Sequence, residues 1–254
     1  MSKKIKGKVL FLTDVHIPFH DKRAYELALK VALSERHLIK EVILNGDFLD
    51  MYGVNGHGVD PRLKVDAEDE IKEGRKELKR IRKLFPKAKL VFLQGNHEFR
   101  LERYMAQNAP AVVDMLTTPK ALELADIKAT YIPFTPDQKY RVMGSSLYAR
   151  HRPNGSGANA AVQTVKNCGA SVIYGDIHKT QESQHVTLRG DYHRAIGVGW
   201  LGNKNHPVMS YVKNHHDWQL GFAIITVLND GTWFCENKTI INYTVMHNGK
   251  IFKA

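Results

Sequence analysis

The sequence predicts an α/β protein with two sheets in one domain spanning residues 1–254. Three strand–loop–helix units occupy the first hundred residues, a pattern typical of strands that run parallel to one another. From residue 170 onward the chain is rich in short strands, and Asn229-Asp230-Gly231 and Asn248-Gly249 are strong hairpin turns. The sequence shows no repeat, low-complexity tract or linker, so a second domain is not expected.

The first half alternates short apolar runs with longer amphipathic segments. The predicted buried strands are Val9–Leu12, Glu41–Leu44 and Lys89–Leu93. The predicted helices span 22–36, capped by Asp21, and Asp66 to Leu84, whose charged residues suit a solvated face. Residues 99–136 are mostly helical in pattern, with prolines as breaks.

The second half changes character after residue 136. Tyr140–Val142 and Ser146–Arg150 suggest a hairpin around Gly144, and a helix of small residues is expected at 158–167. The remaining predicted strands are Ala170–Tyr174, Ser183–Leu188, His193–Val198, Gly221–Leu228, Thr232–Glu236 and Ile240–Val245.

The composition is that of a globular protein, with 43% hydrophobic and 25% charged residues. It excludes a disordered tail, a collagen-like chain and a small disulfide scaffold. The 37 Lys and Arg residues exceed the 26 Asp and Glu residues by 11, which favours polyanionic partners such as nucleic acid or an anionic membrane surface.

The compartment can also be predicted from the sequence. Cys168 and Cys235 form no CxxC pair, so neither a disulfide framework nor a thiolate zinc site is expected, and a reducing compartment fits. The N-terminus lacks the apolar region of a signal peptide, and no stretch approaches the ~18 apolar residues of a membrane helix. A cytoplasmic protein without membrane attachment is expected.

Potential metal ligands follow the predicted strands. The loops after four strands read Asp14-Val15-His16, Gly46-Asp47, Gly95-Asn96-His97-Glu98 and Gly175-Asp176-Ile177-His178, and a fifth strand leads into His151. Ligand sites of α/β sheets lie at the carboxyl ends of strands, so these loops are expected to meet. Each motif alone could be a turn, but the ordered set indicates two divalent cations, bridged by an aspartate, that activate a water for attack on phosphorus.

The order D-x-H, G-D, G-N-H-E, H, G-x-x-H resembles the calcineurin-like metallophosphoesterase superfamily over about residues 8–180. The stretch NHHDWQLGFAIITV at 214–227 is similar to small phage-encoded members, which would place the protein in a host cytoplasm. The resemblance implies a four-layer α/β/β/α sandwich of two mixed sheets. It also implies that one metal is held by Asp14, His16, Asp47 and His178, with Asp47 bridging, and the second by Asn96 and His151.

One position departs from the family pattern. The family usually has G-H-x-H where this chain has Gly175-Asp176-Ile177-His178. A carboxylate at Asp176 can still ligate the second metal, and we favour this over a side chain that points away. Three anionic ligands would favour a harder ion, so Mn²⁺ is the expected ion, with Mg²⁺, Fe²⁺ or Zn²⁺ as alternatives.

His97 is predicted to be catalytic, either stabilising the phosphoryl oxygens or protonating the leaving group. By resemblance to the G-D-x-x-D of phosphoprotein phosphatases, Asp50 would pair with His97 and raise its pKa, although Asp50 could equally be a helix cap. Glu98 could orient the loop. Arginines near the motifs that could hold phosphate, or simply be solvated, are Arg100, Arg103 and Arg152.

The expected activity is hydrolysis of phosphodiester bonds, with nucleic acid as the leading substrate, through a metal-bridging hydroxide. The net charge and the basic segments Lys64–Lys89 and Lys179–Arg194 favour it. Aromatic residues that could stack on bases are Tyr52, Tyr192, Trp200 and Tyr211. The alternatives are a phosphomonoesterase acting on phosphoprotein or nucleotide, suggested by GDFLD and GNHE, and a non-catalytic binding module. The sequence leaves the oligomeric state open.

Overall fold

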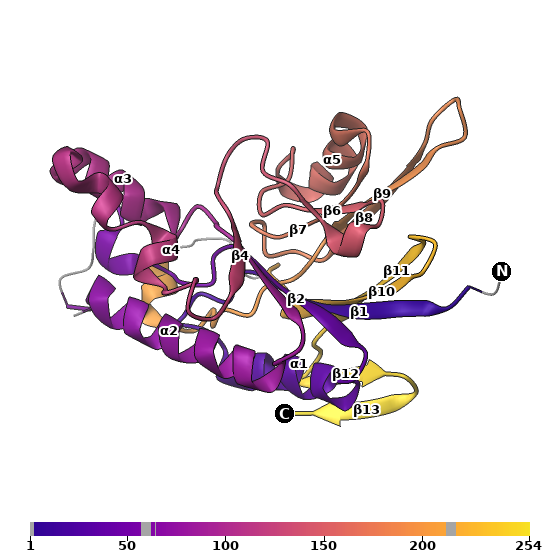
Figure 1. The fold of residues 1–254 in the computed structure, drawn as a ribbon, viewed down its shortest axis with the longest axis horizontal. Coiled ribbons are helices and arrows are strands. Elements are labelled where there is room, and N and C mark those ends of the chain that lie inside the picture. Colours follow the sequence, from indigo (N-terminus) through magenta and orange to yellow (C-terminus); the bar gives the residue numbers. More distant parts are fainter. Residues whose placement is uncertain (1–2, 57–61, 64, 212–216) are drawn as a thin grey trace.

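A computed structural model describes residues 3–56, 62–63, 65–211 and 217–254, and for Ser210 and Tyr211 it describes the backbone only. Within these residues, two large mixed sheets pack against each other, with helices on their outer sides (Figure 1). The prediction for the Tyr211 side chain lies outside the described part, as does the beginning of the 214–227 stretch.

The first sheet has six strands in the order β11-β10-β1-β2-β3-β4. Strands β1 to β4 pair in parallel, whereas β10 runs antiparallel between β1 and β11. Their bounds are Ile5–Leu12 for β1, Ile39–Asn45 for β2, Lys89–Leu93 for β3, Ala129–Ile132 for β4, Gly221–Leu228 for β10 and Trp233–Thr239 for β11. Because β1 and β10 pair, segments from the two ends of the chain lie in one sheet.

The second sheet has five strands in the order β5-β6-β7-β9-β8. Strand β7 is parallel to both β6 and β9, and the outer pairs are antiparallel. The bounds are Tyr140–Arg141 for β5, Leu147–Ala149 for β6, Ser171–Tyr174 for β7, Gln181–Val186 for β8 and Tyr192–Gly197 for β9. A separate hairpin consists of β12, Thr244–His247, and β13, Lys250–Lys253.

Helices cover the outer face of each sheet. Helices α1 and α2 and the β12–β13 hairpin lie below the first sheet in Figure 1, and α5 lies above the second. The bounds are Lys22–Ser34 for α1, Ala67–Leu84 for α2, Phe99–Asn108 for α3, Thr118–Ala121 for α4 and Ala160–Cys168 for α5. Shorter 3₁₀ segments are Tyr52–Val54, Pro110–Met115, Val142–Gly144, Gly157–Asn159 and Pro207–Tyr211.

The expected α/β/β/α layering is confirmed. Phe11 and Ile43 of the first sheet and Ile173 of the second belong to one buried cluster between the sheets. Residues on the other face of the first sheet, such as Leu10, pack instead with α1 residues such as Leu27. Strands buried on both faces are continuously apolar, which is why their polar residues occur at the ends.

Several element boundaries agree with the sequence, but two segments differ. The Asp21 carboxylate caps α1 by accepting from the Ala24 N–H at 3.0 Å, as predicted. The helical pattern predicted through residue 136 is wrong at Ala129–Ile132, which is the edge strand β4. Residues 240–243 form a turn before β12 rather than part of the predicted strand at Ile240–Val245, because β11 runs on to Thr239.

Candidate metal centre

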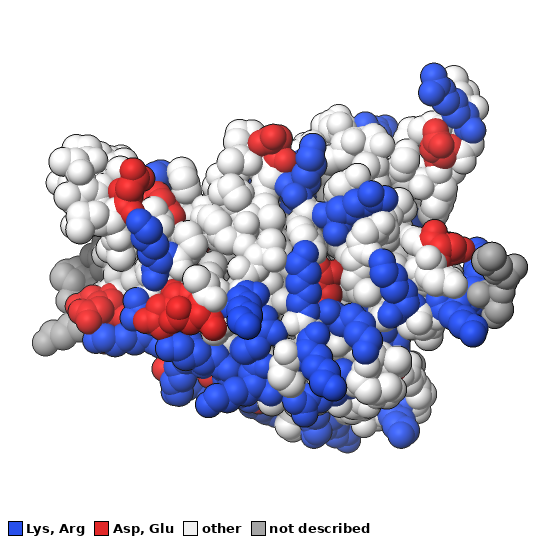
Figure 2. All heavy atoms as spheres, in the orientation of Figure 1, with Lys and Arg blue, Asp and Glu red and all other residues white. Residues whose placement is uncertain are grey.

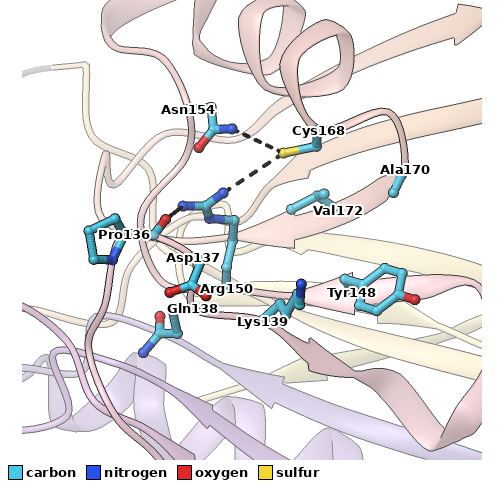
Figure 3. Close-up of a pocket in the computed structure, with 10 residues that line it drawn as sticks. All are labelled: Pro136, Asp137, Gln138, Lys139, Tyr148, Arg150, Asn154, Cys168, Ala170 and Val172. Carbon is cyan, nitrogen blue, oxygen red and sulfur yellow. Dashed lines mark hydrogen bonds between the residues drawn. The ribbon is translucent and has the colours of Figure 1, made fainter.

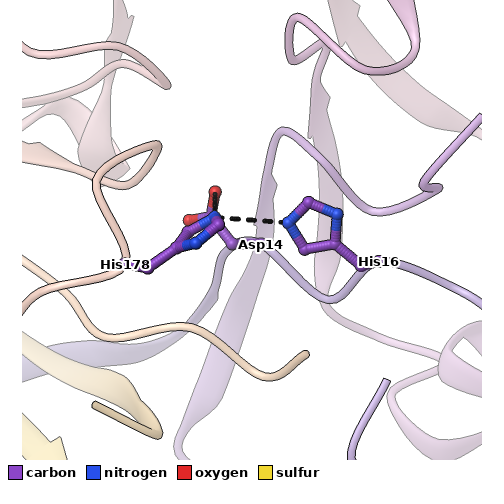
Figure 4. Close-up of side chains that lie close together, drawn as sticks. All are labelled: Asp14, His16 and His178. Carbon is purple, nitrogen blue, oxygen red and sulfur yellow. Dashed lines mark hydrogen bonds and ion pairs between the residues drawn. The ribbon is translucent and has the colours of Figure 1, made fainter. Parts of the chain in front are cut away.

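The strands bring ligand-type side chains from distant segments together at their carboxyl ends. The Nε2 atoms of His16 and His178 lie 3.3 Å apart, and His178 Nε2 lies 3.3 Å from Asp14 Oδ1 (Figure 4). Two ligands of one ion, each about 2.1 Å from it, are separated by about 3.0–3.4 Å. These three side chains therefore have the spacing of a shared cation site.

A second group lies beside the first. His151 Nε2 lies 3.3 Å from Asp47 Oδ1 and 3.1 Å from Asn96 Oδ1. Asp14, Asp47 and His151 also offer ligand atoms within 4.8 Å of one another, so Asp14 belongs to both groups. The convergence expected of five strand ends is found at all six of these residues.

Hydrogen bonding at His151 shows that a cation suits this position. Its Nδ1 lies 2.8 Å from the Asn45 carbonyl oxygen, which can only accept, so Nδ1 carries a hydrogen. Its Nε2 then faces the oxygens of Asp47 and Asn96. A neutral imidazole would present a lone pair to these acceptors, so a proton or a metal ion has to lie between them. The donor set fits a divalent ion.

Asp50 orients His16 and not His97. The Asp50 carboxylate lies 3.0 Å from His16 Nδ1 but 3.7 Å from His97 Nδ1. Because a carboxylate accepts, His16 donates from Nδ1 and directs the lone pair of Nε2 toward His178. The predicted pairing of Asp50 with His97 is thus found only as a longer ion-pair contact, and the carboxylate hydrogen-bonds to a candidate ligand instead.

His97 is held by other partners. Its Nδ1 donates to the main-chain oxygen of Asp50 at 2.7 Å, and Arg100 donates to its Nε2 at 3.1 Å. Burial, which outweighs the nearby charges of Asp47 and Asp50, lowers the pKa of His97 to about 4. The expectation of a raised pKa is therefore wrong for the chain without bound ions, because the carboxylates are too far away to offset desolvation.

The aspartates and His151 show the opposite balance. Burial alone would raise the pKa of Asp47, but the charges of His151 and His97 outweigh it and hold this pKa well below its ordinary value. Burial likewise opposes charge on His151, yet Asp47 and Asp14 hold the pKa of His151 well above its usual range. Both shifts have the same origin, since the buried carboxylates need a nearby positive charge.

Asp176 lies at the rim of the cluster. Its Oδ1 is 3.7 Å from His151 Nε2, and its Oδ2 is 3.5 Å from Nε of the exposed Arg152. Its main-chain N–H donates to both carboxylate oxygens of Asp14 at 3.1 Å. The side chain therefore faces the second group of ligands without being enclosed by it.

The ligand loops have unusual backbone geometry. The φ angles are 52° at Asp14, 58° at His16, 49° at Asp47, 67° at Asp176 and 58° at His178, in the left-handed region that non-glycine residues rarely adopt. Each such residue costs of order 1 kcal/mol or more, and clusters of them are typical of functional sites. The sequence motifs thus fix strained turns as well as ligand types.

Two glycines let loops of the chain pack closely against the aspartates. A Cβ atom at Gly95 would lie 2.1 Å from Asp47 Oδ1, and one at Gly175 would lie 2.3 Å from Asp14 Oδ2. Contacts this short are impossible without moving the carboxylates. Glycine at these motif positions is therefore required by close packing of the ligand loops.

Glu98 ties two of the loops together, as predicted. Its carboxylate accepts from the main-chain N–H groups of Asp47 at 3.0 Å, Leu49 at 2.7 Å and Gly95 at 2.8 Å. Burial and the charge of Asp47 raise the pKa of Glu98 to about 7. A single buried side chain thus fixes the turns after β2 and β3.

A hollow of about 460 Å³ is lined by Gln138 and by Arg150, the residue before His151 (Figure 3). In its wall, the Arg150 guanidinium donates to the Pro136 carbonyl at 3.0 Å and approaches Cys168 Sγ at 3.8 Å. Gln138 lies two residues after Pro136, and its Oε1 accepts from the His151 N–H at 2.9 Å. Gln138 therefore helps to position His151, and the guanidinium of Arg150 belongs to the wall of the hollow.

Two tryptophans that contact a candidate ligand were not assigned this role from the sequence. The His178 ring stacks on Trp200 at 4.7 Å and 17°, and meets Trp218 edge-on at 4.2 Å. The signal was available, since Trp200 follows β9, which is parallel to β7 and ends at the same edge. Trp200 and Tyr52 are only 1% and 5% exposed, so the predicted base stacking on them is wrong, whereas Tyr192 is 53% exposed.

No helix in the described ranges is long and apolar enough to cross a lipid bilayer.

Comparisons with known proteins give distant matches. No protein-family model matches the chain. It is 25% identical over 240 residues to the Gene 54 protein of Mycobacterium phage L5, which covers 89% of this chain and 90% of that protein. The Gene 54 protein of Mycobacterium phage D29 matches with the same identity and coverage.

Solved structures also match at low identity. A conserved uncharacterized protein of Streptococcus pneumoniae, described as a predicted phosphoesterase, has 10% identity and a TM-score of 0.34, with 94% of this chain and 99% of that chain covered. The Pseudomonas putida nuclease MPE has 14% identity and a TM-score of 0.33, with coverages of 86% and 84%.

Proposed function

We propose that the protein is a metal-dependent phosphoesterase. The observation that carries the proposal is the meeting of Asp14, His16 and His178 with Asp47 and His151 at one edge of the sheets. Histidine nitrogens and carboxylate oxygens without thiolates are the donor set of ions that promote phosphoester hydrolysis. A single domain over residues 1–254 is proposed with it, supported by the pairing of β1 with β10.

Two divalent ions fit the two adjoining groups, and Mn²⁺ is the ion we propose. Asp14, His16 and His178 would hold one ion, and Asn96 with His151 the other. Asp47 is proposed to bridge them, and Asp176 is proposed as an additional oxygen ligand at the rim. Such ions would supply an activated water nucleophile and positive charge for the phosphoryl oxygens.

Residues beside the ligands would bind and orient the phosphoryl group. His97 and Arg100 form a hydrogen-bonded pair that offers N–H donors next to Asp47. The exposed Arg152, held near Asp176, would draw the phosphate toward the rim. We propose that His97 acts on the phosphoryl oxygens through Arg100: its Nδ1 hydrogen is donated to the main-chain oxygen of Asp50, so its Nε2 accepts from the guanidinium and orients the remaining N–H donors of Arg100.

Nucleic acid is the proposed substrate, through its phosphodiester bonds. The net charge of +11 favours a polyanion. The phosphomonoesterase alternative was suggested by GDFLD and GNHE, and it has less support because Asp50 of the first motif hydrogen-bonds to His16, whereas its carboxylate lies 3.7 Å from the His97 ring. The remaining alternative, a binding module without catalysis, is tested by the same experiment as the activity itself.

The test compares three substrates under several added ions: duplex DNA, single-stranded DNA and nitrophenyl phosphate monoester. We expect hydrolysis of DNA with Mn²⁺, loss of activity with chelator, and a fall of about 10²-fold in turnover for His97→Ala with metal content retained, because Arg100 would lose its orienting partner. Lys72→Gln, on the exposed face of α2, serves as the matched control and should keep full turnover. Hydrolysis of the monoester alone would contradict the proposed substrate, and metal binding without any turnover would favour the binding module.

A further inference from the structure

A basic groove lies where the parallel strands of the first sheet begin. It has a volume of about 490 Å³, and Figure 2 shows Lys and Arg gathered over this face of the molecule. We call it the amino-end groove. Its charged lining consists of Lys6, Lys40, Lys89, Lys139 and Arg141, with Glu41 as the acidic member.

The cations of the amino-end groove are exposed and bound to neutral partners. Lys6 Nζ donates to the Met143 carbonyl at 2.7 Å, and Lys40 Nζ donates to the His37 carbonyl at 2.9 Å. Lys89 Nζ donates to the Tyr140 hydroxyl at 3.0 Å. Carbonyl and hydroxyl oxygens orient an ammonium group without cancelling its charge.

Arg141 also has a neutral partner, and Lys139 is exposed. Arg141 Nε donates to the Ser145 carbonyl at 2.7 Å. Glu41 is buried at 1% exposure, and its carboxylate accepts from the Tyr140 hydroxyl and the Met143 N–H. The one acid is thus turned inward, while five cations face solvent around it.

Helix α2 provides the contrast, because its cations have acidic partners. Lys72 pairs with Glu68 at 2.9 Å, and Lys79 pairs with Glu123 at 2.8 Å. Arg80 binds both oxygens of Glu26 at 2.6 Å. The α2 part of the segment Lys64–Lys89 is therefore largely neutralised, since five of its seven cations have acidic partners, whereas Lys89 of the same segment lies in the groove.

The amino-end groove is far from the candidate metal centre. Lys89 is the first residue of β3, and Asn96 lies just beyond its end. At about 3.3 Å per residue, these two positions are roughly 20 Å apart. A phosphate held by the groove is therefore not the phosphate that would react.

We propose that the amino-end groove is a second docking site for the phosphodiester backbone of nucleic acid. A concave row of exposed cations fits a charged strand, whereas a bilayer surface is flat. Because the substrate proposed above is also nucleic acid, this inference deepens that proposal. The test separates the two by measuring binding without turnover.

The experiment uses the full chain in the presence of chelator and a fluorescent DNA duplex of about 30 base pairs. One variant carries Lys6→Gln, Lys40→Gln and Lys139→Gln. A matched variant carries Lys72→Gln, Lys76→Gln and Lys79→Gln, which removes the same charge from α2. We expect the first to weaken binding by at least about tenfold and to reduce the slope of log K against log salt by about 3, since each lost phosphate contact contributes about 0.9.

The α2 variant should bind within about threefold of the original chain. Equal loss in both variants would overturn the proposal, because it would show that only net charge matters. Equal binding of the original chain to vesicles containing phosphatidylserine would also overturn it. Turnover of a small nitrophenyl phosphodiester should be the same in both variants, which reports that each has folded. If neither the original chain nor the variants hydrolyse any ester, the binding measurements still test the docking site.

Discussion

Strand β2 begins beside Lys40 and ends beside Asp47, and its neighbours β1 and β3 repeat this arrangement. One edge of the sheet therefore carries buried carboxylates and imidazoles, and the opposite edge carries exposed lysines. Asp47 is 2% exposed, whereas the Lys40 side chain is exposed and bound only to a carbonyl. The charged groups are therefore stabilised differently at the two edges of the sheet.

The difference follows from solvation. A buried carboxylate must find positive charge, so the carboxyl-end cluster pairs its acids with imidazoles and suits metal ions. An exposed lysine is stabilised by water and needs no partner, so it remains available to a polyanion. Chemistry is therefore expected at one edge and long-range attraction at the other, and substitutions can separate them.

The largest effect is expected for Asp47→Asn, paired with Lys40→Gln at the other end of the same strand. Asp47 contacts His151 at 3.3 Å and would bridge both ions, so its loss should lower turnover by at least about a thousandfold and reduce metal content. Lys40→Gln should keep both. Turnover of a small diester and elemental analysis measure the pair. Normal activity in Asp47→Asn would show that the reaction does not take place at the metal centre proposed at the carboxyl ends of the strands.

The pKa of Glu70 predicts that the stability of the fold depends on pH. It lies on α2, accepts from the Gly53 N–H at 2.9 Å, and burial raises its pKa to about 7. Its unfolded pKa is about 4.3, so between pH 4.3 and 7 the folded state holds more protons than the unfolded state. The stability this group contributes is therefore complete below about pH 4.3 and is lost as the pH rises through about 7.

The corresponding free energy is about 4 kcal/mol, because the folded and unfolded pKa values of Glu70 differ by roughly 2.7. Glu70→Gln, which cannot ionise, should remove this share of the pH dependence. Urea unfolding at several pH values between 4.5 and 7.5, with chelator present, measures it. Glu98 also has a pKa of about 7, so some slope should remain in the variant. An identical slope in both proteins would show that Glu70 does not titrate in this range.

How far the sequence predicted these features depends on the distance over which each interaction acts. The meeting of Asp14, Asp47 and His178 was predictable, because parallel strands place their carboxyl ends at one edge. The partner of His97 was not, because the choice between the carboxylate and the carbonyl of Asp50 depends on turn geometry. Spacing in a motif does not encode which atom faces the ring.

The edge strand β4 and the groove show the same limit. Ala129–Ile132 has four half-buried residues after a helical stretch, too few to show alternation. The lysines of the amino-end groove are scattered between residues 6 and 139, and only Lys89 belongs to a basic segment that the sequence analysis identified. The run that was visible, in α2, is the one with acidic partners. Whether a charge is compensated depends on tertiary neighbours.

A smaller effect is expected from Gly95→Ala, compared with Gly144→Ala. A Cβ at Gly95 would lie 2.1 Å from Asp47 Oδ1, so the carboxylate must move and metal affinity should fall by about 10–100-fold. Gly144 has φ +74°, and a Cβ there meets only Lys6 Nζ at 3.8 Å, so its variant is strained but leaves the ligands in place. Titration with Mn²⁺ measures both. Equal Mn²⁺ affinities of the two variants would show that the ligand loops can move apart without displacing the ligands.

The smallest effect concerns stability, and its sign distinguishes the two sets of lysines. The α2 lysines have acidic partners, so replacing Lys72, Lys76 and Lys79 by glutamine should lower Tm by about 2 °C. The groove lysines repel one another without such partners, so replacing Lys6, Lys40 and Lys139 should leave Tm unchanged or raise it by about 1 °C. Calorimetry at low salt measures both. A clear loss of Tm in the groove variant would mean that these lysines stabilise the fold, and docking would no longer be needed to explain a row of like charges.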